Sequence, residues 1–378
     1  MREVYVISKN PKTDRLKFAL PSTEFHYLEL STIKTSVVKR VTRRLNGLMK
    51  GSRSPGSYEK LVAEALAQSL GDSGAAIIAL DNSITFIRAL VETNFSGPVL
   101  LIQHGGNYFS YRPEASVVLP NSLLLSWGNR EILSYGFLGC RPEFVVPVGS
   151  VLNDAYVKSR RDYDFKKRKN RICIVSEFRD DQHEQYDNYM SQRVHSWSII
   201  LTQIRECAER LNLEIDVALR PGVFGATSQE RQKQYFTQFL GNRCTFTEHN
   251  SEFASYRAVD RSEVTVGLQS ALLAESLGRD NKVVYINPLN DVRLKSPITG
   301  YCTADGLSTT ELIRHISTVL GISIDTFQKS IQPSLKYLIR RNVDTSAAIR
   351  LAGSLLREGR STSEIEDALY HLSAASST

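Results

Sequence analysis

Three polar residues in this sequence lie at the ends of short apolar runs that have the length of a β-strand. They are His104, Glu177 and Arg220. Because ligands of parallel α/β sheets bind outside the carboxyl ends of the strands, we expect these side chains to line binding sites. A histidine or glutamate there can transfer a proton, and the planar guanidinium of an arginine suits phosphate or carboxylate.

The turn that contains His104 reads Gln103-His104-Gly105-Gly106-Asn107. Paired glycines allow a backbone to approach a ligand closely, which would leave the imidazole to act as acid, base or oxyanion donor. The alternative is a turn in which the histidine only caps the neighbouring backbone.

The other two strand ends carry Ser176-Glu177 and Arg220-Pro221-Gly222. Burial in a cleft could shift the pKa of Glu177, and the Pro-Gly pair would fix the turn that aims Arg220. The alternatives are a solvated loop glutamate and a surface salt bridge.

The densest pattern is a strand, a Gly-Leu-Gln-Ser turn at 267–270 and a helix that begins after Ser270. The N–H groups of such a helix start, together with the serine hydroxyl, form an anion site suited to a nucleotide phosphate. Glu275 on the same helix could reach a ribose. A serine cap with a purely structural role is the alternative.

These residues require elements that position them. At 378 residues the chain exceeds the size at which single cores stop growing, about 250 to 300 residues. Apolar runs of strand length alternate with helical segments in both halves, which predicts parallel sheets buried on both faces. We expect an α/β protein with two Rossmann-like domains that face a central cleft, followed by C-terminal helices. The predicted parts are 1–155, a basic linker at 156–170, 171–305, and helices at 306–378.

Composition and motif content narrow the possible classes of function and of binding partner. The chain has 47 Lys and Arg against 40 Asp and Glu, a net charge of +7, which suggests an anionic partner. Five cysteines without a CxxC pair argue against a disulfide framework or a zinc site, and no apolar run is long enough for a membrane span. We therefore expect a cytoplasmic protein. The sequence lacks the dinucleotide, P-loop and nucleic-acid-binding signatures.

The largest acid-free basic segment lies between Glu29 and Glu59. Within it, residues 34–53 combine basic side chains with apolar ones at helical spacing, as in a helix that lies on an anionic membrane at the inner face. A solvated helix face and a grip on an anionic acceptor are the alternatives.

The segment 258–286 resembles the donor half of GT-B glycosyltransferases. With the Gln103-His104 turn and Ser176-Glu177, the chain is similar to bacterial surface and capsular polysaccharide transferases, and more loosely to the retaining β-Kdo transferases, which use a CMP sugar. The resemblance spans roughly residues 75–305.

This resemblance implies that Ser270 holds the donor phosphate, Glu275 the ribose and Arg220 a phosphate or sugar carboxylate. His104 would face the acceptor, and the retaining relatives imply a carboxylate nucleophile, for which Glu177 and Asp260 are the candidates and Glu248 the reserve. The donor side then comprises Ser176, Arg220, Pro221, Gly222, His249, Gly267, Gln269, Ser270 and Glu275, and the acceptor side Gln103, Gly105, Gly106 and Asn107.

The expected function is a glycosyltransferase without metal or other cofactor, since no DxD motif occurs and helix dipoles with arginine can stabilise the leaving group. It would move a sugar, more narrowly Kdo or a related acidic sugar from a CMP donor, onto a surface polysaccharide or lipid-linked glycan. The alternatives are a CDP-polyol phosphotransferase, a nucleotide-sugar epimerase of the same fold, and a non-catalytic binding module for anionic ligands.

Overall fold

The computed structural model describes residues 2–8, 15–29, 63–64, 66–68, 70–71, 73–80, 84–105, 117–129, 140–160, 166–178, 188–220, 226–247, 251–296, 298–341 and 343–375. The chain forms two compact units, and it crosses between them twice. The first unit consists of residues 1–158 and 339–378, and the second of residues 159–338.

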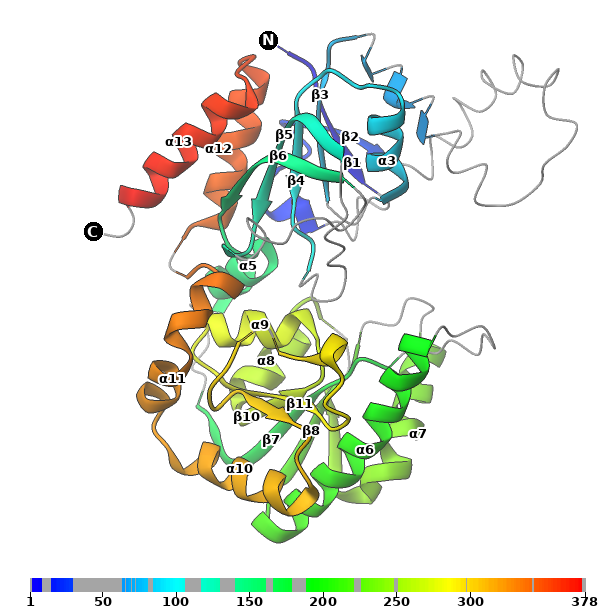
Figure 1. The fold of residues 1–378 in the computed structure, drawn as a ribbon, viewed down its shortest axis with the longest axis vertical. Helices are drawn as coiled ribbons and strands as arrows, with labels where there is room; N and C mark the ends of the chain where they lie inside the picture. Colours follow the sequence, from blue (N-terminus) through cyan, green and yellow to red (C-terminus); the bar gives the residue numbers. More distant parts are fainter. Residues whose placement is uncertain are drawn as a thin grey trace, which may run out of the picture. The chain divides into compact units, whose positions relative to one another are not determined.

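The first unit contains a six-stranded parallel sheet with the order β2-β1-β3-β4-β5-β6 (Figure 1). Its strands are β1 Val4–Ser8, β2 His26–Glu29, β3 Ala76–Leu80, β4 Val99–Ile102, β5 Val117–Ser126 and β6 Cys140–Pro147. Its described helices are η1 Arg15–Phe18, α3 Ile84–Glu92, α5 Val151–Ser159, α12 Thr345–Arg357 and α13 Thr362–Ala375.

Successive residues of a strand point to opposite faces of the sheet, and here each face packs into a hydrophobic core of its own. On β3, Ile77 belongs to the core that includes Phe86 of α3. The neighbouring Ile78 belongs to the core that includes Ile349 of α12. Residues from 339 onward therefore supply part of the layer that covers one face of the first sheet, together with residues of η1 and α5.

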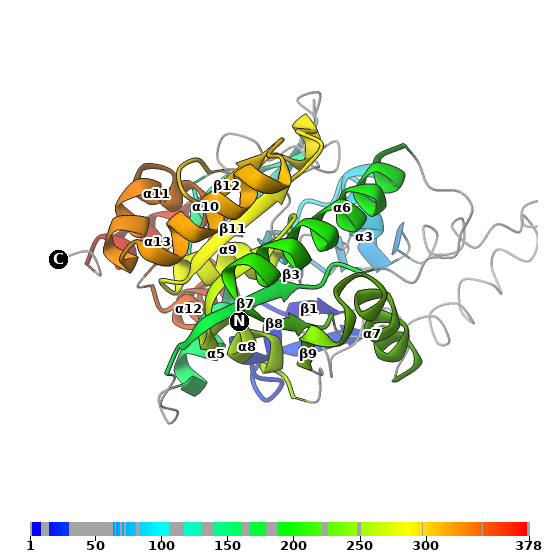
Figure 2. The ribbon, with the colours of Figure 1, turned by 90° about the horizontal axis from the view of Figure 1, so that it is seen from below.

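The second unit contains another six-stranded parallel sheet, with the order β12-β11-β10-β7-β8-β9. Its strands are β7 Arg168–Val175, β8 Glu214–Ala218, β9 Cys244–Thr247, β10 Ser262–Gly267, β11 Lys282–Asn287 and β12 Thr303–Asp305. Its helices are α6 Asn188–Leu211, α7 Ala226–Leu240, η3 Gly241–Arg243, α8 Ala254–Arg261, α9 Ala271–Gly278, η4 Val292–Leu294, α10 Thr309–Gly321 and α11 Ile324–Leu338. Figures 1 and 2 show α6 and α10 on one face of the sheet and α8 and α9 on the other.

The two parallel sheets confirm the predicted fold class, but the segments between and after them differ from the expectation. The first crossing between the units, at residues 158–159, falls inside the predicted linker at 156–170. The same range also contains the end of α5 and the start of β7. The predicted block of C-terminal helices is divided, since α10 and α11 belong to the second unit and α12 and α13 to the first. Ser308 and Glu311 form a capping box at the start of α10.

The basic segment at 34–53 lies outside the described residues. Within the residues that the structure describes, no helix is both long enough and apolar enough to cross a membrane.

Helix α12 of the first unit packs closely against Phe25 and Leu20 at Gly353, and a substitution there can test this contact. A Cβ on Gly353 of α12 would lie 2.9 Å from ring atoms of Phe25 and 3.2 Å from a methyl carbon of Leu20. Both of these side chains are buried. At Gly321 of α10, by contrast, no described atom beyond its chain neighbours and its own helix backbone lies within 4 Å of the added Cβ.

We expect Gly353→Ala to destabilise the first unit by about 1 to 2 kcal/mol, because overpacking in the core outweighs the gain in helix propensity. Gly321→Ala should instead be neutral or stabilising by up to about 1 kcal/mol. Trp127 lies in the first unit and Trp197 in the second, and the chain has 2 tryptophans. Urea unfolding in a Trp197→Phe background, followed by Trp127 fluorescence, measures Gly353→Ala in the first unit. Gly321 lies in the second unit, so Gly321→Ala is measured in a Trp127→Phe background by Trp197 fluorescence. A loss of stability for Gly353→Ala no larger than that for Gly321→Ala, each against its own background, would contradict the packing of α12.

Candidate functional site

The strand order of the second unit puts the carboxyl ends of β10, β7 and β8 beside one another. The polar residues that follow these ends are Ser176 and Glu177, Arg220, and Gln269 and Ser270, which we call the carboxyl-edge cluster. The sequence predicted that these residues follow strands. Hydrogen bonds and the shared partner Gln232 link them in the structure, apart from Ser270, which directly follows Gln269.

The carboxylate of Glu177 is buried, with 7% of the residue exposed, and two elements hold it. Its Oε1 accepts a hydrogen bond from the backbone N–H of Gln269 at 2.6 Å. Its Oε2 pairs with the guanidinium of Arg193 on α6. Glu177 thus fixes the turn after β10 against the end of β7, which is the contact of a positioning residue. Its role as a catalytic carboxylate stays a prediction.

A buried glutamine of α7 connects two further strand ends. Oε1 of Gln232 accepts hydrogen bonds from the Ser176 hydroxyl at 2.9 Å and from the backbone N–H of Arg220 at 3.0 Å. Its Nε2 donates to the carbonyl oxygen of Arg220 at 3.1 Å. The backbone that carries the Arg220 side chain is therefore held in place from both sides.

The turn after β10 brings α9 close to the sheet. A Cβ on Gly267 would lie 3.0 Å from Cδ1 of Leu273, so the absence of a side chain at Gly267 permits this approach. Ser270 caps α9, and its hydroxyl accepts a hydrogen bond from the backbone N–H of Leu272 at 3.3 Å. The first turn of α9 carries no acidic residue of its own. The carboxylate of Glu177, which accepts from the Gln269 N–H before the cap, is paired with Arg193.

A second glutamine stabilises the same turn. The side chain of Gln269 is buried, and its Nε2 donates to the carbonyl oxygen of Arg293 at 2.9 Å. Arg293 pairs with Asp291 at 2.7 Å and also contacts Gln192 of α6. The loop after β11 thus supports the turn that precedes α9.

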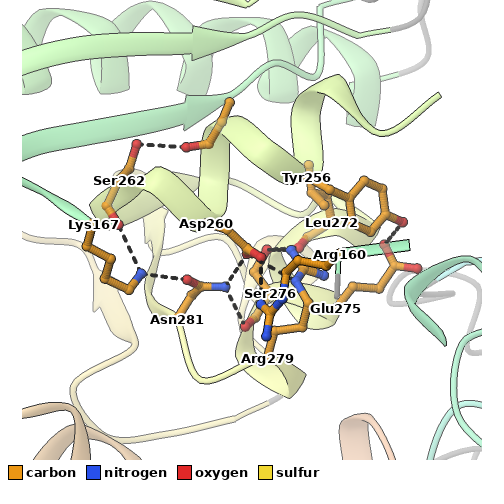
Figure 3. A network of polar contacts seen from close by, with 11 residues as sticks. Arg160, Lys167, Tyr256, Asp260, Ser262, Leu272, Glu275, Ser276, Arg279 and Asn281 are labelled. Carbon is orange, nitrogen blue, oxygen red and sulfur yellow. Dashed lines mark hydrogen bonds and ion pairs between the residues drawn. The ribbon is translucent and has the colours of Figure 1, made fainter. Parts of the chain in front are cut away.

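Glu275 does not lie where a ribose contact was expected. It is 2% exposed, and its Oε2 accepts a hydrogen bond from the hydroxyl of Tyr256 on α8 at 2.6 Å (Figure 3). The guanidinium carbon of Arg279 lies 4.8 Å from the centre of the Tyr256 ring. Burial and this partner make Glu275 a contact between α8 and α9, which corrects the predicted ribose role.

Asp260 also occupies a different place from the one that a catalytic carboxylate requires. It precedes β10 and so lies at the amino-terminal edge of the sheet, opposite the carboxyl-edge cluster. Its Oδ1 accepts from Arg279 at 3.1 Å and from Asn281 at 2.8 Å, and its Oδ2 accepts from Arg160 at 3.0 Å (Figure 3). These buried pairings correct the predicted catalytic role to a structural one.

A lysine completes this network. Nζ of Lys167 donates to Oδ1 of Asn281 at 2.7 Å and to the carbonyl oxygen of Ser262 at 3.0 Å. Burial lowers the pKa of Lys167, and the carboxylate of Asp260 acts in the opposite direction. Part of the segment expected to form a basic linker is thus hydrogen-bonded to the second unit, although residues 166–170 are exposed.

In the first unit, Gln103 follows β4 and is buried. Its Oε1 accepts from the backbone N–H of Trp127 at 2.6 Å, and its Nε2 donates to the carbonyl oxygen of Gly105 at 2.9 Å. Gln103 therefore shapes the turn and joins the ends of β4 and β5, rather than offering its amide to an acceptor. His104 is half-buried at the same strand end, and its role stays a prediction.

The remaining predicted site residues lie outside the described part of the chain. They are Gly106, Asn107, Pro221, Gly222, Glu248 and His249. Among the residues that the structure describes, no group of three or more His, Cys, Asp or Glu side chains could hold a metal ion.

Sequence reasoning missed two residues that support the cluster, Arg193 and Gln232. Gln232 carried a signal, because with Phe236 and Leu240 it forms a stripe at intervals of four residues whose other members are apolar. A polar residue in a buried stripe indicates a hydrogen-bonding task inside the protein. Arg193 carried no comparable signal, since polar residues surround it in the first turns of α6.

A protein-family model described as "putative O-antigen biosynthesis protein" matches residues 145–299, which include the whole carboxyl-edge cluster. Among proteins of curated function, no sequence matches this chain.

Two solved structures are similar over nearly the whole chain. S. aureus MnaA, solved with UDP, has a TM-score of 0.57 and 11% identity, covering 95% of this chain and 97% of its own. The Methanocaldococcus jannaschii UDP-GlcNAc 2-epimerase, solved with UDP-GlcNAc and UDP, has a TM-score of 0.53 and 14% identity, covering 95% and 100%. Together with the two six-stranded parallel sheets, these likenesses show a GT-B-like fold.

We expect Asp260→Ala to destabilise the second unit by about 3 to 5 kcal/mol, because it leaves the buried guanidinium of Arg279 without its carboxylate. The control is Glu230→Ala, which removes a surface pair with Lys233 and should cost about 0.5 kcal/mol or less. Urea unfolding in a Trp127→Phe background, followed by Trp197 fluorescence, measures both. A loss for Asp260→Ala no larger than the control's would exclude the buried pair.

Proposed function

We propose that this chain is an enzyme that binds a nucleotide sugar at the carboxyl-edge cluster and acts in the synthesis of an O-antigen or a related bacterial surface polysaccharide. The observation that carries the proposal is the cluster itself. Three adjacent strand ends are linked by hydrogen bonds beside a capped helix start that has no acid in its first turn. The family model that spans the cluster supports the pathway, and the two neighbours solved with UDP support the ligand class.

Each residue has a proposed task. The first turn of α9, with Ser270, would hold the donor phosphates, because helix N-termini bind anions through free N–H groups and the dipole. The guanidinium of Arg220 would offset further negative charge on the phosphates or on an acidic sugar. Glu177, Gln232 and the Gln269 side chain would keep these groups in place.

Two reactions fit this binding mode. The first is transfer of the sugar to a surface polysaccharide or lipid-linked glycan, with Kdo or a related acidic sugar from a CMP donor as the narrower form of the proposal. His104 would then face the acceptor from the first unit. The second is epimerisation of the nucleotide sugar, which the Methanocaldococcus jannaschii neighbour favours. We propose no metal or further cofactor for either reaction.

A nucleotide screen tests the binding site. We expect at least one of UDP, CMP, CDP, GDP and TDP to raise the melting temperature of the protein. A ligand at about 100 times its Kd increases the free energy of unfolding by about 2.7 kcal/mol. Ser270→Asp should abolish the shift, because aspartate caps a helix as well as serine but repels an anion at that position. Ser308→Asp makes the same change at the cap of α10 and should leave the shift intact. The absence of a shift with every nucleotide would refute the proposal.

Turnover distinguishes the reactions. NMR of the nucleotide sugar without acceptor detects an epimer or free sugar, whereas mass spectrometry with a lipid-linked acceptor detects an added sugar, or an added phosphate for a polyol phosphotransferase. Glu177→Gln keeps an oxygen that can accept from the Gln269 N–H, so nucleotide binding should persist. Loss of turnover in this variant would support a catalytic Glu177, and full turnover would restrict it to positioning.

A further inference from the structure

A hollow of about 390 Å³ lies in the second unit between α8 and the strands β7, β8 and β9. Four of its lining residues are arginines, namely Arg168, Arg171, Arg257 and Arg261. Its single lining carboxylate is that of Asp216. The formal charge of the lining is therefore +3, and none of the residues of the carboxyl-edge cluster contributes to it.

The carboxylates in and beside the hollow pair with only one of the arginines. Arg171 lies 3.9 Å from Asp216 and also pairs with Glu214. The guanidinium of Arg257 contacts the hydroxyl of Ser251, which is uncharged. Within the described part of the chain, the guanidinium groups of Arg168 and Arg261 have no hydrogen-bond or ion-pair partner. Three cations thus face one hollow without a carboxylate of their own.

Helix stability does not explain the two arginines of α8. Arg257 and Arg261 are four residues apart on α8, and like charges at this spacing repel each other on a helix. Ala254 and Ala258 of the same helix also line the hollow. Apolar residues at positions 257 and 261 would extend this face without the repulsion. The repulsion is relieved when an anion lies between the guanidinium groups.

The strand opposite α8 is also irregular at this place. The register of β7 against β10 shifts between Ser262 and Val264, and Asn170 has a left-handed φ of 57°. Because side chains of a regular strand alternate between faces, Arg168 and Arg171, three residues apart, would point to opposite sides. The bulge allows both to line the hollow, as bulges do where they redirect a side chain.

We propose that this hollow is a second anion site, which binds a phosphate-bearing ligand independently of the nucleotide-sugar site. Arginine forks match phosphate oxygens in a bidentate manner, and three of them suit a diphosphate or a phosphorylated sugar better than a single small anion. The volume falls within the range of small-molecule sites, about 300 to 1,000 Å³. Phe246 provides an apolar wall for the rest of the ligand. The phosphate can belong to a soluble ester or to a lipid headgroup.

The test uses pyrophosphate as the probe and isothermal titration calorimetry as the readout. We expect Arg257→Gln with Arg261→Gln to weaken pyrophosphate binding by about tenfold or more, since two charge-assisted forks are lost. Arg314→Gln, the same change on the exposed surface of α10, is the matched control and should bind like the wild type. Unchanged binding in the double variant, with intact circular dichroism, would overturn the proposal.

Arginine footprinting locates the bound probe. Pyrophosphate should protect Arg168, Arg257 and Arg261 from phenylglyoxal, as measured by mass spectrometry, and should leave Arg314 reactive. Protection of Arg220 alone would assign pyrophosphate to the carboxyl-edge cluster and would refute a second site.

The same variants separate the two sites and the two sources of phosphate. Ser270→Asp should lose the nucleotide shift and keep pyrophosphate protection of Arg257, so failure of the nucleotide screen would leave this test standing. Sedimentation with phosphatidylglycerol vesicles, compared with phosphatidylcholine vesicles, detects a headgroup ligand. Vesicle binding that the double variant loses would identify a lipid phosphate, and pyrophosphate binding without vesicle binding would identify a soluble ester.

Discussion

The arrangement of the second unit depends on one buried ion pair, that of Asp260 with Arg279. An unpaired charge in a protein interior is strongly destabilising, so the last turn of α8 and the segment after α9 must meet wherever this sequence folds. The Tyr256 hydroxyl that donates to Glu275 adds a second polar contact between α8 and α9. These contacts set the position of α9, whose first turn lies in the proposed nucleotide site, and of α8, whose outer arginines line the hollow.

The sequence predicted most strands of both sheets, because apolar runs of strand length stood out between polar turns and helical segments. It did not predict the short edge strands β2 and β12. It also placed Glu177 and Ser270 correctly at strand ends, since that follows from order along the chain. The tasks of Glu275 and Asp260 could not be inferred in this way. Whether a carboxylate faces a ligand or an internal cation depends on partners such as Tyr256 and Arg279, which are brought near by packing.

The helices from residue 306 onward show the same limit. The capping box at Ser308 marks a helix start through local hydrogen bonds, so it can be recognised from four residues. The layer that a helix joins depends instead on whether its apolar face fits a distant surface. Gly353 allows α12 to approach Phe25, a contact between residues more than 300 positions apart that no local pattern encodes.

The division of the first unit into residues 1–158 and 339–378 has a consequence for synthesis on the ribosome. One core of its sheet includes Ile349, Ala352 and Leu356 of α12, so that face stays incompletely covered until these residues have emerged. The second unit is continuous in sequence and can complete its core earlier. The second unit, whose sheet begins later in the chain, can therefore finish folding before the first. Meanwhile the first sheet presents apolar surface to chaperones while about 180 further residues are translated.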